Sequence, residues 1–399
     1  MSLSALICTL QIVLRQLSFG PTQDLSVLNN NSCESVQEID EAVEAYMKKY
    51  EFHGAQLAVM KNDALVYCKG YGYSDAKAGT LMEASDIMRI ASVSKLVTAV
   101  GIMKMEEMGL LSLDDKVFGP NGILNDEDLC SCIRDKNIYK ISVEDLLRHK
   151  GGFSARRYDP MFCVGNVDPR ETLKRELRRR LAFMPGKSQE YSNLGYYILS
   201  LIIEKLGRDS YENWMRHNVL IPLQCYNFRI AGNYLSERYP REVRYHMQRG
   251  SEARYDFHGN GNKVEQCYGG NNVSGVLGAG AWVSSAPELC RFVAGIDGDW
   301  GLWDILSSES IERMTEYFDE KTYSLGWNDT NQYGVWTRTG SFSGTTAIIK
   351  YFENDSECWV LLTNTSTFLG PRIASRSSKL IKHLRKFTDK LPSKDLFYR

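Results

Sequence analysis

The chain has 399 residues, of which 43% are hydrophobic and 24% are charged. These are ordinary values for a globular protein with a sizeable core, and the length allows two or three domains. The formal net charge of −1 gives no reason to expect nucleic acid or an anionic membrane as the main partner. The ten cysteines and six histidines show no metal-ligand spacing, so we predict neither a metal nor a cofactor.

The chain begins with an apolar run at residues 2–14, followed by a polar stretch at 21–32. The run is too short to span a bilayer but has the length of a signal-peptide core, although no Lys or Arg precedes it. We therefore expect residues 1–33 to be a leader and linker. Export to the periplasm or cell surface is the preferred expectation, and a cytoplasmic location stays open.

The first predicted elements are a helix and a hairpin. Residues 34–50 place apolar side chains at helical spacing among acidic ones, which predicts an amphipathic helix. Residues 55–60 and 65–72 are apolar and β-prone, and a Lys-Asn-Asp turn separates them. They predict two antiparallel strands.

A serine and a lysine open the next helix, which ends near Gly109. Ser92 and Lys95 are three positions apart, so they share one helix face and the amine can reach the hydroxyl. A serine hydroxyl needs an adjacent base to become a good nucleophile. Ser94 is a weaker candidate for the nucleophile, because it directly precedes Lys95 and adjacent side chains on a helix do not face each other.

The middle of the chain is mostly helical. A short helix is predicted at 141–149, with Ser142 as its N-cap. A longer amphipathic helix is predicted at 169–181, and we expect its basic face to be solvated rather than to bind nucleic acid. Tyr191-Ser-Asn193 leads into an apolar helix at 194–206. Residues 225–275 lack periodicity and predict an irregular, exposed segment that could face a substrate.

The last third of the chain mixes helices with strands. A tight turn is predicted at 278–285 and a mostly helical segment at 304–318. Three strands are predicted at 335–338, 345–352 and 358–364, and a final helix at 372–387. The turn precedes a further helix that starts near residue 286.

This order predicts an α+β fold. Strands near both ends would form one antiparallel sheet flanked by helices, with a mostly helical insert. We expect residues 34–115 and 276–399 to form the sheet domain and residues 116–275 the helical domain, with the active site between them.

Two further motifs carry chemistry. Tyr191 could act as a base if a nearby ammonium lowers its pKa, and Asn193 can accept from an amine while donating to a substrate carbonyl. The other motif, Arg338-Thr339-Gly340-Ser341, lies on a predicted strand. Its glycine would let a substrate backbone approach, and its cation would let a substrate carboxylate pair with the charge.

Taken in order, the three motifs resemble the serine β-lactamase and penicillin-binding-protein superfamily. The similarity is greatest to class C β-lactamases, D-alanyl-D-alanine carboxypeptidases, and related esterases and D-aminopeptidases. Four longer stretches, at 89–95, 146–153, 185–197 and 278–285, share it. The resemblance runs from about residue 38 to the final helix and implies a β-lactamase/transpeptidase-like fold.

The resemblance also implies roles for the motif residues. Ser92 would be the acylated nucleophile, and Lys95 would take or relay its proton. Tyr191 would protonate the leaving group and help to activate the deacylating water, while Asn193 would position the substrate. Backbone N–H groups of Ser92 and Ser341 would form the oxyanion hole.

Arg338 departs from the pattern, because the family has Lys or His there. Its permanent charge and forked donor favour recognition of a substrate carboxylate, with Thr339 and Gly340 beside it, and exclude proton shuttling. His149 falls where the family has a structural histidine, and we expect it to pack rather than to act as a base.

Three functional hypotheses follow. The preferred one is a serine hydrolase that forms an acyl-enzyme with a small-molecule or peptide substrate, as a carboxypeptidase, peptidase, esterase or, less favoured, a β-lactamase. The second is a non-hydrolytic penicillin- or peptide-binding sensor with the same fold. The third is an unrelated α+β protein. No transmembrane span is predicted, and the sequence gives no oligomeric state.

Overall fold

The computed structural model describes residues 23–155, 158–163, 165, 167–299, 301–319 and 322–398. The apolar run at 2–14, which carried the expectation of export, lies outside these ranges. Within them, every helix is too short or too polar to cross a bilayer. The stretch expected to be a linker packs on the body from residue 23 onward. Leu25 and Leu28 are buried, and the Asn30 side chain donates to the Gly70 and Met82 carbonyls.

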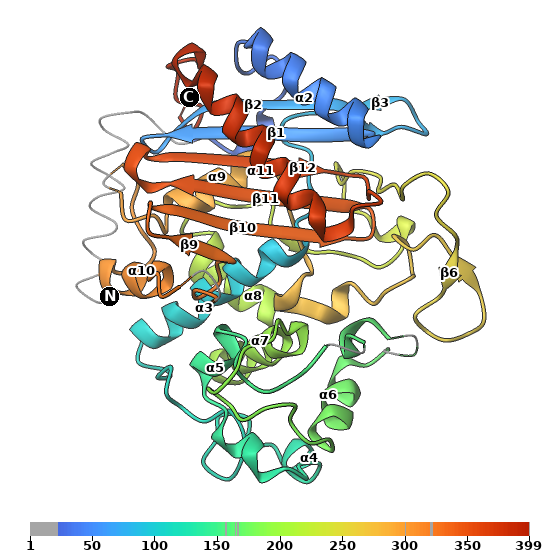
Figure 1. Cartoon of the computed structure of the whole chain (residues 1–399), viewed down its shortest axis with the longest axis vertical. Coiled ribbons are helices and arrows are strands. Elements are labelled where there is room, and N and C mark those ends of the chain that lie inside the picture. Colours follow the sequence, from blue (N-terminus) through green and yellow to red (C-terminus); the bar gives the residue numbers. More distant parts are fainter. Residues whose placement is uncertain are drawn as a thin grey trace.

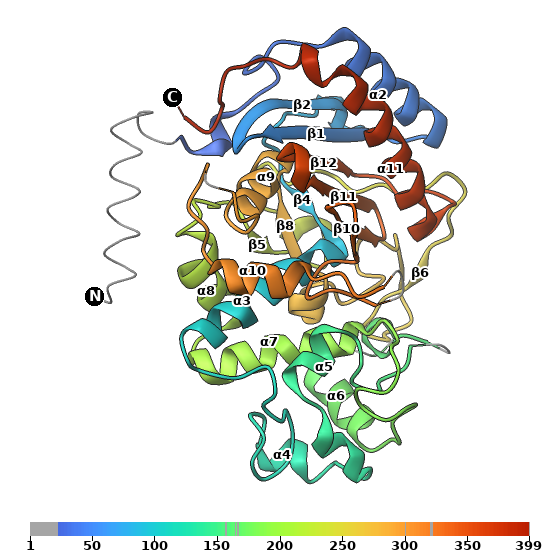
Figure 2. The same cartoon turned by 60° about the vertical axis from the view of Figure 1, so that its left-hand side comes forward.

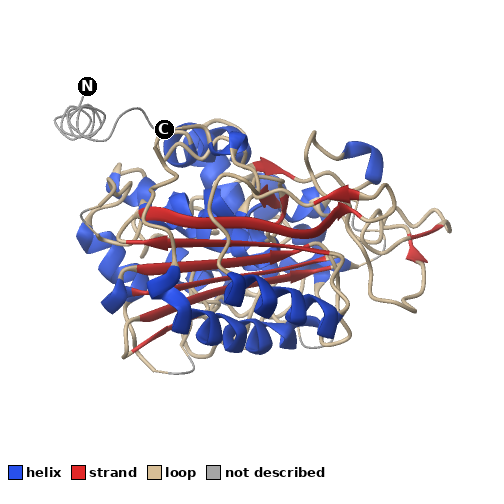
Figure 3. Ribbon diagram, turned by 90° about the horizontal axis from the view of Figure 1, so that it is seen from above, coloured by secondary structure: helices blue, strands red, loops and turns tan. Residues whose placement is uncertain are grey.

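A seven-stranded antiparallel sheet forms the centre of the fold, with the order β3-β2-β1-β12-β11-β10-β9 (Figures 1 and 3). Its strands are β1 (Gly54–Lys61), β2 (Ala64–Asp75), β3 (Thr80–Leu81), β9 (Asp329–Asn331), β10 (Val335–Phe342), β11 (Thr345–Phe352) and β12 (Glu357–Thr363). β1 pairs with β12, so the two ends of the chain meet in the middle of the sheet.

The β1–β2 hairpin illustrates why these residues form strands. Asn62 and Asp63 both adopt positive φ, at 50° and 59°, as a tight two-residue hairpin turn requires. β1 is buried on both faces, which explains why apolar residues follow one another at 57–60 in place of an alternating pattern.

Two helices cover one face of the sheet: α2 (Gln37–Tyr50) and α11 (Ile373–Leu384) (Figure 3). Their apolar sides pack on β-strand residues such as Leu57 and Trp359 in one buried cluster. The Tyr46 hydroxyl of α2 lies 2.8 Å from the Ser377 hydroxyl of α11. This hydrogen bond joins two helices that are more than 300 residues apart in the chain.

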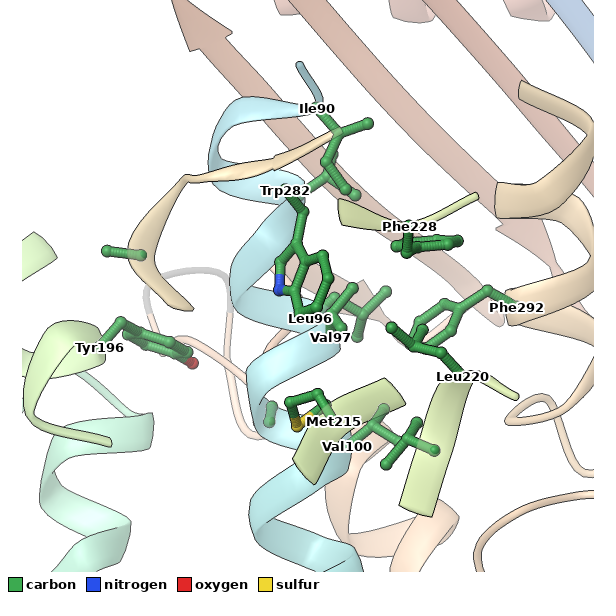
Figure 4. Packing of buried hydrophobic residues seen from close by; sticks show 14 of the residues in the cluster. Ile90, Leu96, Val97, Val100, Tyr196, Met215, Leu220, Phe228, Trp282 and Phe292 are labelled. Atoms are coloured by element: carbon green, nitrogen blue, oxygen red, sulfur yellow. The ribbon is translucent and has the colours of Figure 1, made fainter. Parts of the chain in front are cut away.

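The remaining helices lie on the other side of the sheet (Figure 2). They are α3 (Ser94–Glu107), α4 (Glu127–Cys130), α5 (Val143–Leu147), α6 (Pro169–Leu177), α7 (Asn193–Gly207), α8 (Tyr211–Met215), α9 (Ala286–Ala294) and α10 (Ser308–Thr315). α3 runs through the main core, where Val97 and Val100 pack among Trp282, Phe228 and Met215 (Figure 4). A helix that is apolar on all sides belongs in such a place.

Small strands complete the fold. β4 (Met88–Arg89), β8 (Trp282–Ser284) and β5 (Arg229–Ile230) form a three-stranded sheet, and β6 (Arg254–Tyr255) pairs with β7 (Lys263–Val264). β8 is a correction, because its residues fall inside the stretch predicted as a tight turn. A strand of three buried residues is too short to show an alternating pattern.

The α+β class and the sheet made from both chain ends are confirmed. The predicted helix at 304–318 is too long, because α10 begins only after the Ser307 cap and ends at Thr315. Ile305 and Leu306 are buried in a loop rather than in a helix. Their burial produced the apolar pattern that suggested helix.

Candidate active site

Ser92 lies at the junction between β4 and α3, in a single 3₁₀ turn (Ala91–Val93). The preceding strand is held by Ile90 N–H, which donates to the Trp282 carbonyl at 3.0 Å. Ala91 has φ of 48°, a left-handed conformation that is uncommon for a residue with a side chain. Such strained residues cluster at functional sites. Ser92 is partly exposed, whereas Ser94 is fully buried and accepts from Trp282 N–H.

Lys95 is fully buried one turn after Ser92. Its Nζ donates to Asn193 Oδ1 at 2.6 Å, to the Ala279 carbonyl at 2.5 Å and to Ser92 Oγ at 3.3 Å. Nζ also lies 4.8 Å from the centre of the Tyr191 ring. The first two sequence motifs therefore meet at this amine.

The start of α7 positions Tyr191 and Asn193. Ser192 is the N-cap, and its hydroxyl accepts from Gly195 N–H at 3.1 Å. Ser192 N–H in turn donates to His149 Nδ1 at 3.1 Å. These bonds fix the residues on either side of the cap, so that both point towards Lys95.

The electrostatics of this site favour proton transfer. Burial lowers the pKa of Lys95, and the Arg338 charge adds to this effect, while the nearby Tyr191 phenol opposes it. For Tyr191, burial alone would raise the pKa. The charges of Lys95 and Arg338, with hydrogen bonds to Lys95 and Ser92, lower the pKa of this phenol below its usual value.

His149 packs against the site, as predicted. Its ring centre lies 4.5 Å from that of Tyr191 and 4.8 Å from that of Tyr323. Burial, together with the charges of Lys95 and Arg338, holds the His149 pKa well below its usual value. A neutral ring whose Nδ1 accepts from the backbone is a positioning element for α7.

β10 forms the opposite wall of the site. A Cβ atom on Gly340 would lie 2.3 Å from the Ile90 carbonyl oxygen and 3.1 Å from Ser92 N, so only glycine allows this approach. Thr339 N–H and its hydroxyl both donate to Asn328 Oδ1. Since alternate strand residues present their N–H groups on the same edge, Ser341 N–H also points away from β11.

Arg338 occupies a different place from the one predicted. Its side chain is fully buried, and both Nε and Nη2 donate to the Ser92 carbonyl, at 2.8 and 2.6 Å. A guanidinium group that donates two hydrogen bonds to one carbonyl holds the backbone of Ser92 in place. The geometry therefore favours a positioning role over contact with a substrate carboxylate.

Two further groups at the site were not predicted from the sequence. Asp159 Oδ2 accepts from Asn193 Nδ2 at 2.5 Å, and the Ala279 carbonyl accepts from Lys95. Ala279 lies in the 278–285 stretch that resembled the family, but a backbone acceptor leaves no mark on residue type. Asp159 caps a single 3₁₀ turn in a segment without periodicity, so no sequence signal could have placed it beside Asn193.

Space for a ligand lies next to Asn193. A cavity of about 310 Å³ opens between the α5–α6 region and the start of α7. Its lining includes Gly152, Phe153, Tyr158, Asp159, Arg179, Leu181, Ser192 and Asn193. Nearby, Phe162 and Phe342 bring their rings to 5.3 Å, which links the helical side of the molecule to the end of β10.

Comparison with known proteins decides the family. The protein-family model described as "Beta-lactamase" matches residues 39–379, which is most of the chain. The chain belongs to the β-lactamase family. The predicted resemblance is therefore confirmed at the level of the family.

Relatives within this family share part of the chain. Penicillin-binding protein 4* of Bacillus subtilis is 25% identical over 332 residues, covering 77% of this chain and 67% of the relative. Protein flp of Staphylococcus aureus is 29% identical over 195 residues, covering 48% of this chain. The matched region spans 37% of the length of protein flp.

The fold is also that of solved structures. D-amino acid amidase from Ochrobactrum anthropi SV3 superimposes with a TM-score of 0.69 over 88% of this chain and 99% of the amidase, at 18% identity. At this identity the similarity shows a shared fold. Membership of the β-lactamase family, with the geometry around Ser92, supports a function of the serine-hydrolase type.

Proposed function

We propose that this chain is a serine hydrolase that forms an acyl-enzyme on Ser92 with a small amide or ester. The observation that carries the proposal is the environment of Lys95. Its fully buried amine lies 3.3 Å from Ser92 Oγ and is held by two shorter bonds to fixed acceptors. An adjacent base held in this way is what a serine hydroxyl needs to become nucleophilic.

Acylation begins with neutral Lys95, a form that its lowered pKa favours. A neutral amine has two hydrogens, which the Asn193 and Ala279 oxygens accept, and its lone pair then faces Ser92 Oγ. The Ser92 proton moves to this lone pair as Oγ bonds to the substrate carbonyl carbon. The bond between that carbon and the leaving group breaks when the tetrahedral intermediate collapses.

Tyr191 completes the proton transfers. Its hydroxyl gives a proton to the departing amine or alkoxide, and the proton that Lys95 took from Ser92 replaces it. In deacylation Tyr191 takes a proton from the attacking water and passes its own proton to neutral Lys95. Lys95 then gives that proton to Ser92 Oγ as the bond between Oγ and the ester carbon breaks. The lowered pKa of Tyr191 suits a group that must both give and accept a proton.

The negative charge on the intermediate needs donors. We assign this role to the backbone N–H groups of Ser92 and Ser341, because Gly340 brings β10 directly against the 3₁₀ turn that carries Ser92. Removing one such donor typically costs about 10²–10³-fold in rate. Asn193 keeps one N–H for a substrate carbonyl, since its other groups bond Lys95 and Asp159.

The relatives support a choice of substrates. One is named a penicillin-binding protein and one fold neighbour is named a D-amino acid amidase, so peptides and amino-acid amides join simple esters as candidates. β-Lactams are the less favoured subset, because no separate glutamate for deacylation is evident in the sequence.

A substrate panel tests the proposal. Nitrophenyl esters, a D-amino-acid amide, a D-Ala-D-Ala peptide and a penicillin are assayed with the wild type, Ser92→Ala and Ser94→Ala. We expect turnover of at least one ester or amide, its loss in Ser92→Ala and its retention in Ser94→Ala. Stable acylation without turnover of any substrate would instead favour the non-hydrolytic sensor, and equal turnover in Ser92→Ala would refute the proposal.

A further inference from the structure

A cluster of aspartates lies on elements outside the Ser92 site. Asp63 stands on the β1–β2 turn, and Asp297 and Asp299 stand on the loop that follows α9. One oxygen of each carboxylate lies within 4.8 Å of the others. Asp63 and Asp297 are buried, so this is not a solvated acidic surface.

One buried carboxylate oxygen of this cluster has no hydrogen-bond partner among the described residues. Asp297 is only 5% exposed, and its Oδ1 accepts from Asp299 N–H at 3.0 Å, whereas its buried Oδ2 has no hydrogen-bond partner. In the part of the chain that the structure describes, no basic side chain forms an ion pair with Asp297, Asp299 or Asp304. Buried carboxylates are normally paired or bound to a metal.

The surrounding groups that the structure describes bring more oxygen atoms to the cluster and no positive charge. Asp304, on the same loop, adds a fourth carboxyl group. The Tyr351 hydroxyl donates to Asp299 Oδ2 at 3.0 Å but carries no charge to neutralise it. A bound cation would supply the missing positive charge.

We propose that Asp63, Asp297 and Asp299 bind a calcium ion. The donors are all oxygen, which hard cations prefer. Calcium–oxygen distances of about 2.3–2.6 Å let ligands on opposite sides of the ion stand roughly 4.6–5.2 Å apart, which suits a cluster within 4.8 Å. Magnesium, at about 2.1 Å, needs a tighter set.

The loop geometry shows what the ion would connect. A Cβ atom on Gly301 would lie 2.0 Å from Asp63 Oδ2, and Leu302 N–H donates to the same oxygen at 2.8 Å. The loop therefore closes over the hairpin turn. Further along, the Ile305 carbonyl accepts from Lys104 of α3. The ion would tie the sheet to the far end of the helix that Ser92 precedes.

Metal-dependent unfolding of the full chain tests the site without using activity. Protein stripped with a chelator is heated with no metal, with calcium and with magnesium, and calcium binding is measured directly by calorimetry. We expect one bound calcium ion and a Tm raised by several degrees, with a smaller rise in magnesium. Absence of binding heat and of any calcium-dependent shift in Tm would overturn the proposal, as would a larger response to magnesium.

Asp297→Asn identifies the ligands, and Asp389→Asn, on an exposed residue, is the matched control. We expect the calcium-dependent rise in Tm to vanish in Asp297→Asn and to persist in the control. Without metal, Asp297→Asn should melt no lower than the wild type, because one repelling charge is gone. An unchanged calcium response in Asp297→Asn contradicts the site, and Asp299→Asn gives the same comparison if the first variant does not fold.

Discussion

At the scale of single residues, one buried guanidinium lowers the pKa of two neighbouring groups. Arg338 binds the Ser92 carbonyl and lowers the pKa of both Lys95 and Tyr191. A positive charge disfavours a neighbouring ammonium and favours a phenolate, so both effects have the same sign. Arg338 therefore extends the pH range in which the proposed base is ready to act.

Replacing Arg338 should move the pH profile. In Arg338→Met the pKa values of Lys95 and Tyr191 both rise, so the acid limb of kcat/KM shifts to higher pH. The maximum also falls, because the Ser92 carbonyl loses two donors. The measurement is kcat/KM for the best ester of the panel between pH 5 and pH 10.

Arg338→Lys is the matched variant for that profile. It keeps the charge but loses the fork, so the acid limb should stay close to that of the wild type while the maximum falls. If Arg338→Met retains the wild-type acid limb, Arg338 does not tune the site as described.

At the scale of elements, the contact between β10 and the turn carrying Ser92 shapes the site. Gly340→Ala would put a methyl carbon 2.3 Å from the Ile90 carbonyl oxygen. Because that oxygen belongs to the backbone, β10 and the turn that carries Ser92 must move apart to accommodate the methyl group. Displacing β10 by about 1 Å should reduce kcat/KM on the order of 10²-fold. Gly195→Ala, on α7, is the control, because the nearest atom to the added Cβ would be Ser192 Oγ at 3.6 Å, an ordinary van der Waals contact. Equal activity of the two variants would contradict this account.

α9 contains a carboxyl group that should make stability depend on pH. Burial raises the pKa of Glu288 to about 7, against hydrogen bonds from Asn227 that lower it. Its Oε1 accepts from Asn227 N–H, and its Oε2 has no hydrogen-bond partner. Between the unfolded and folded pKa values, the folded chain keeps a proton that the unfolded chain has lost. This term therefore lowers stability as pH rises from about 4.5 to about 7.

Glu288→Gln should remove that term. Relative to the wild type, the variant gains stability with rising pH, by an amount on the order of 3 kcal/mol at pH 8. Its advantage should be small at pH 4.5. Urea unfolding of both proteins at the two pH values measures the difference, and a constant difference would show that the Glu288 pKa is the same in the folded and unfolded chains.

At the scale of the whole molecule, one buried cluster joins the sheet to the helical region. It includes Ala58 of β1, Val97 of α3 and Ile198 of α7. We propose that residues 116–275 form a helical unit beside a sheet unit of 34–115 and 276–399. Because α3 packs on both units, we expect them to unfold together.

Ile198→Ala tests this coupling. The substitution should cost about 2–5 kcal/mol and lower the midpoint of one common transition. Calorimetry and near-ultraviolet circular dichroism should report the same midpoint in the wild type and in the variant. Two separate transitions, with only one moved by Ile198→Ala, would show that the units unfold independently.

Sequence patterns predicted what depends on local residues. The β1–β2 hairpin, α7 and its Ser192 region, and the pairing of both chain ends in one sheet follow from periodicity and motif order. Other features depend on tertiary contacts that residue type does not encode. Examples are the three-residue strand β8, the Asp159–Asn193 bond and the inward turn of Arg338.

The most direct test of the central claim is the mass of the protein after covalent labelling of its nucleophile. The chain is incubated with a fluorophosphonate or a slowly hydrolysed ester, and intact mass and peptide mapping locate the adduct. We predict one adduct, on Ser92, that is absent in Ser92→Ala and present in Ser94→Ala. An adduct on another residue, or an undiminished adduct in Ser92→Ala, would contradict the account.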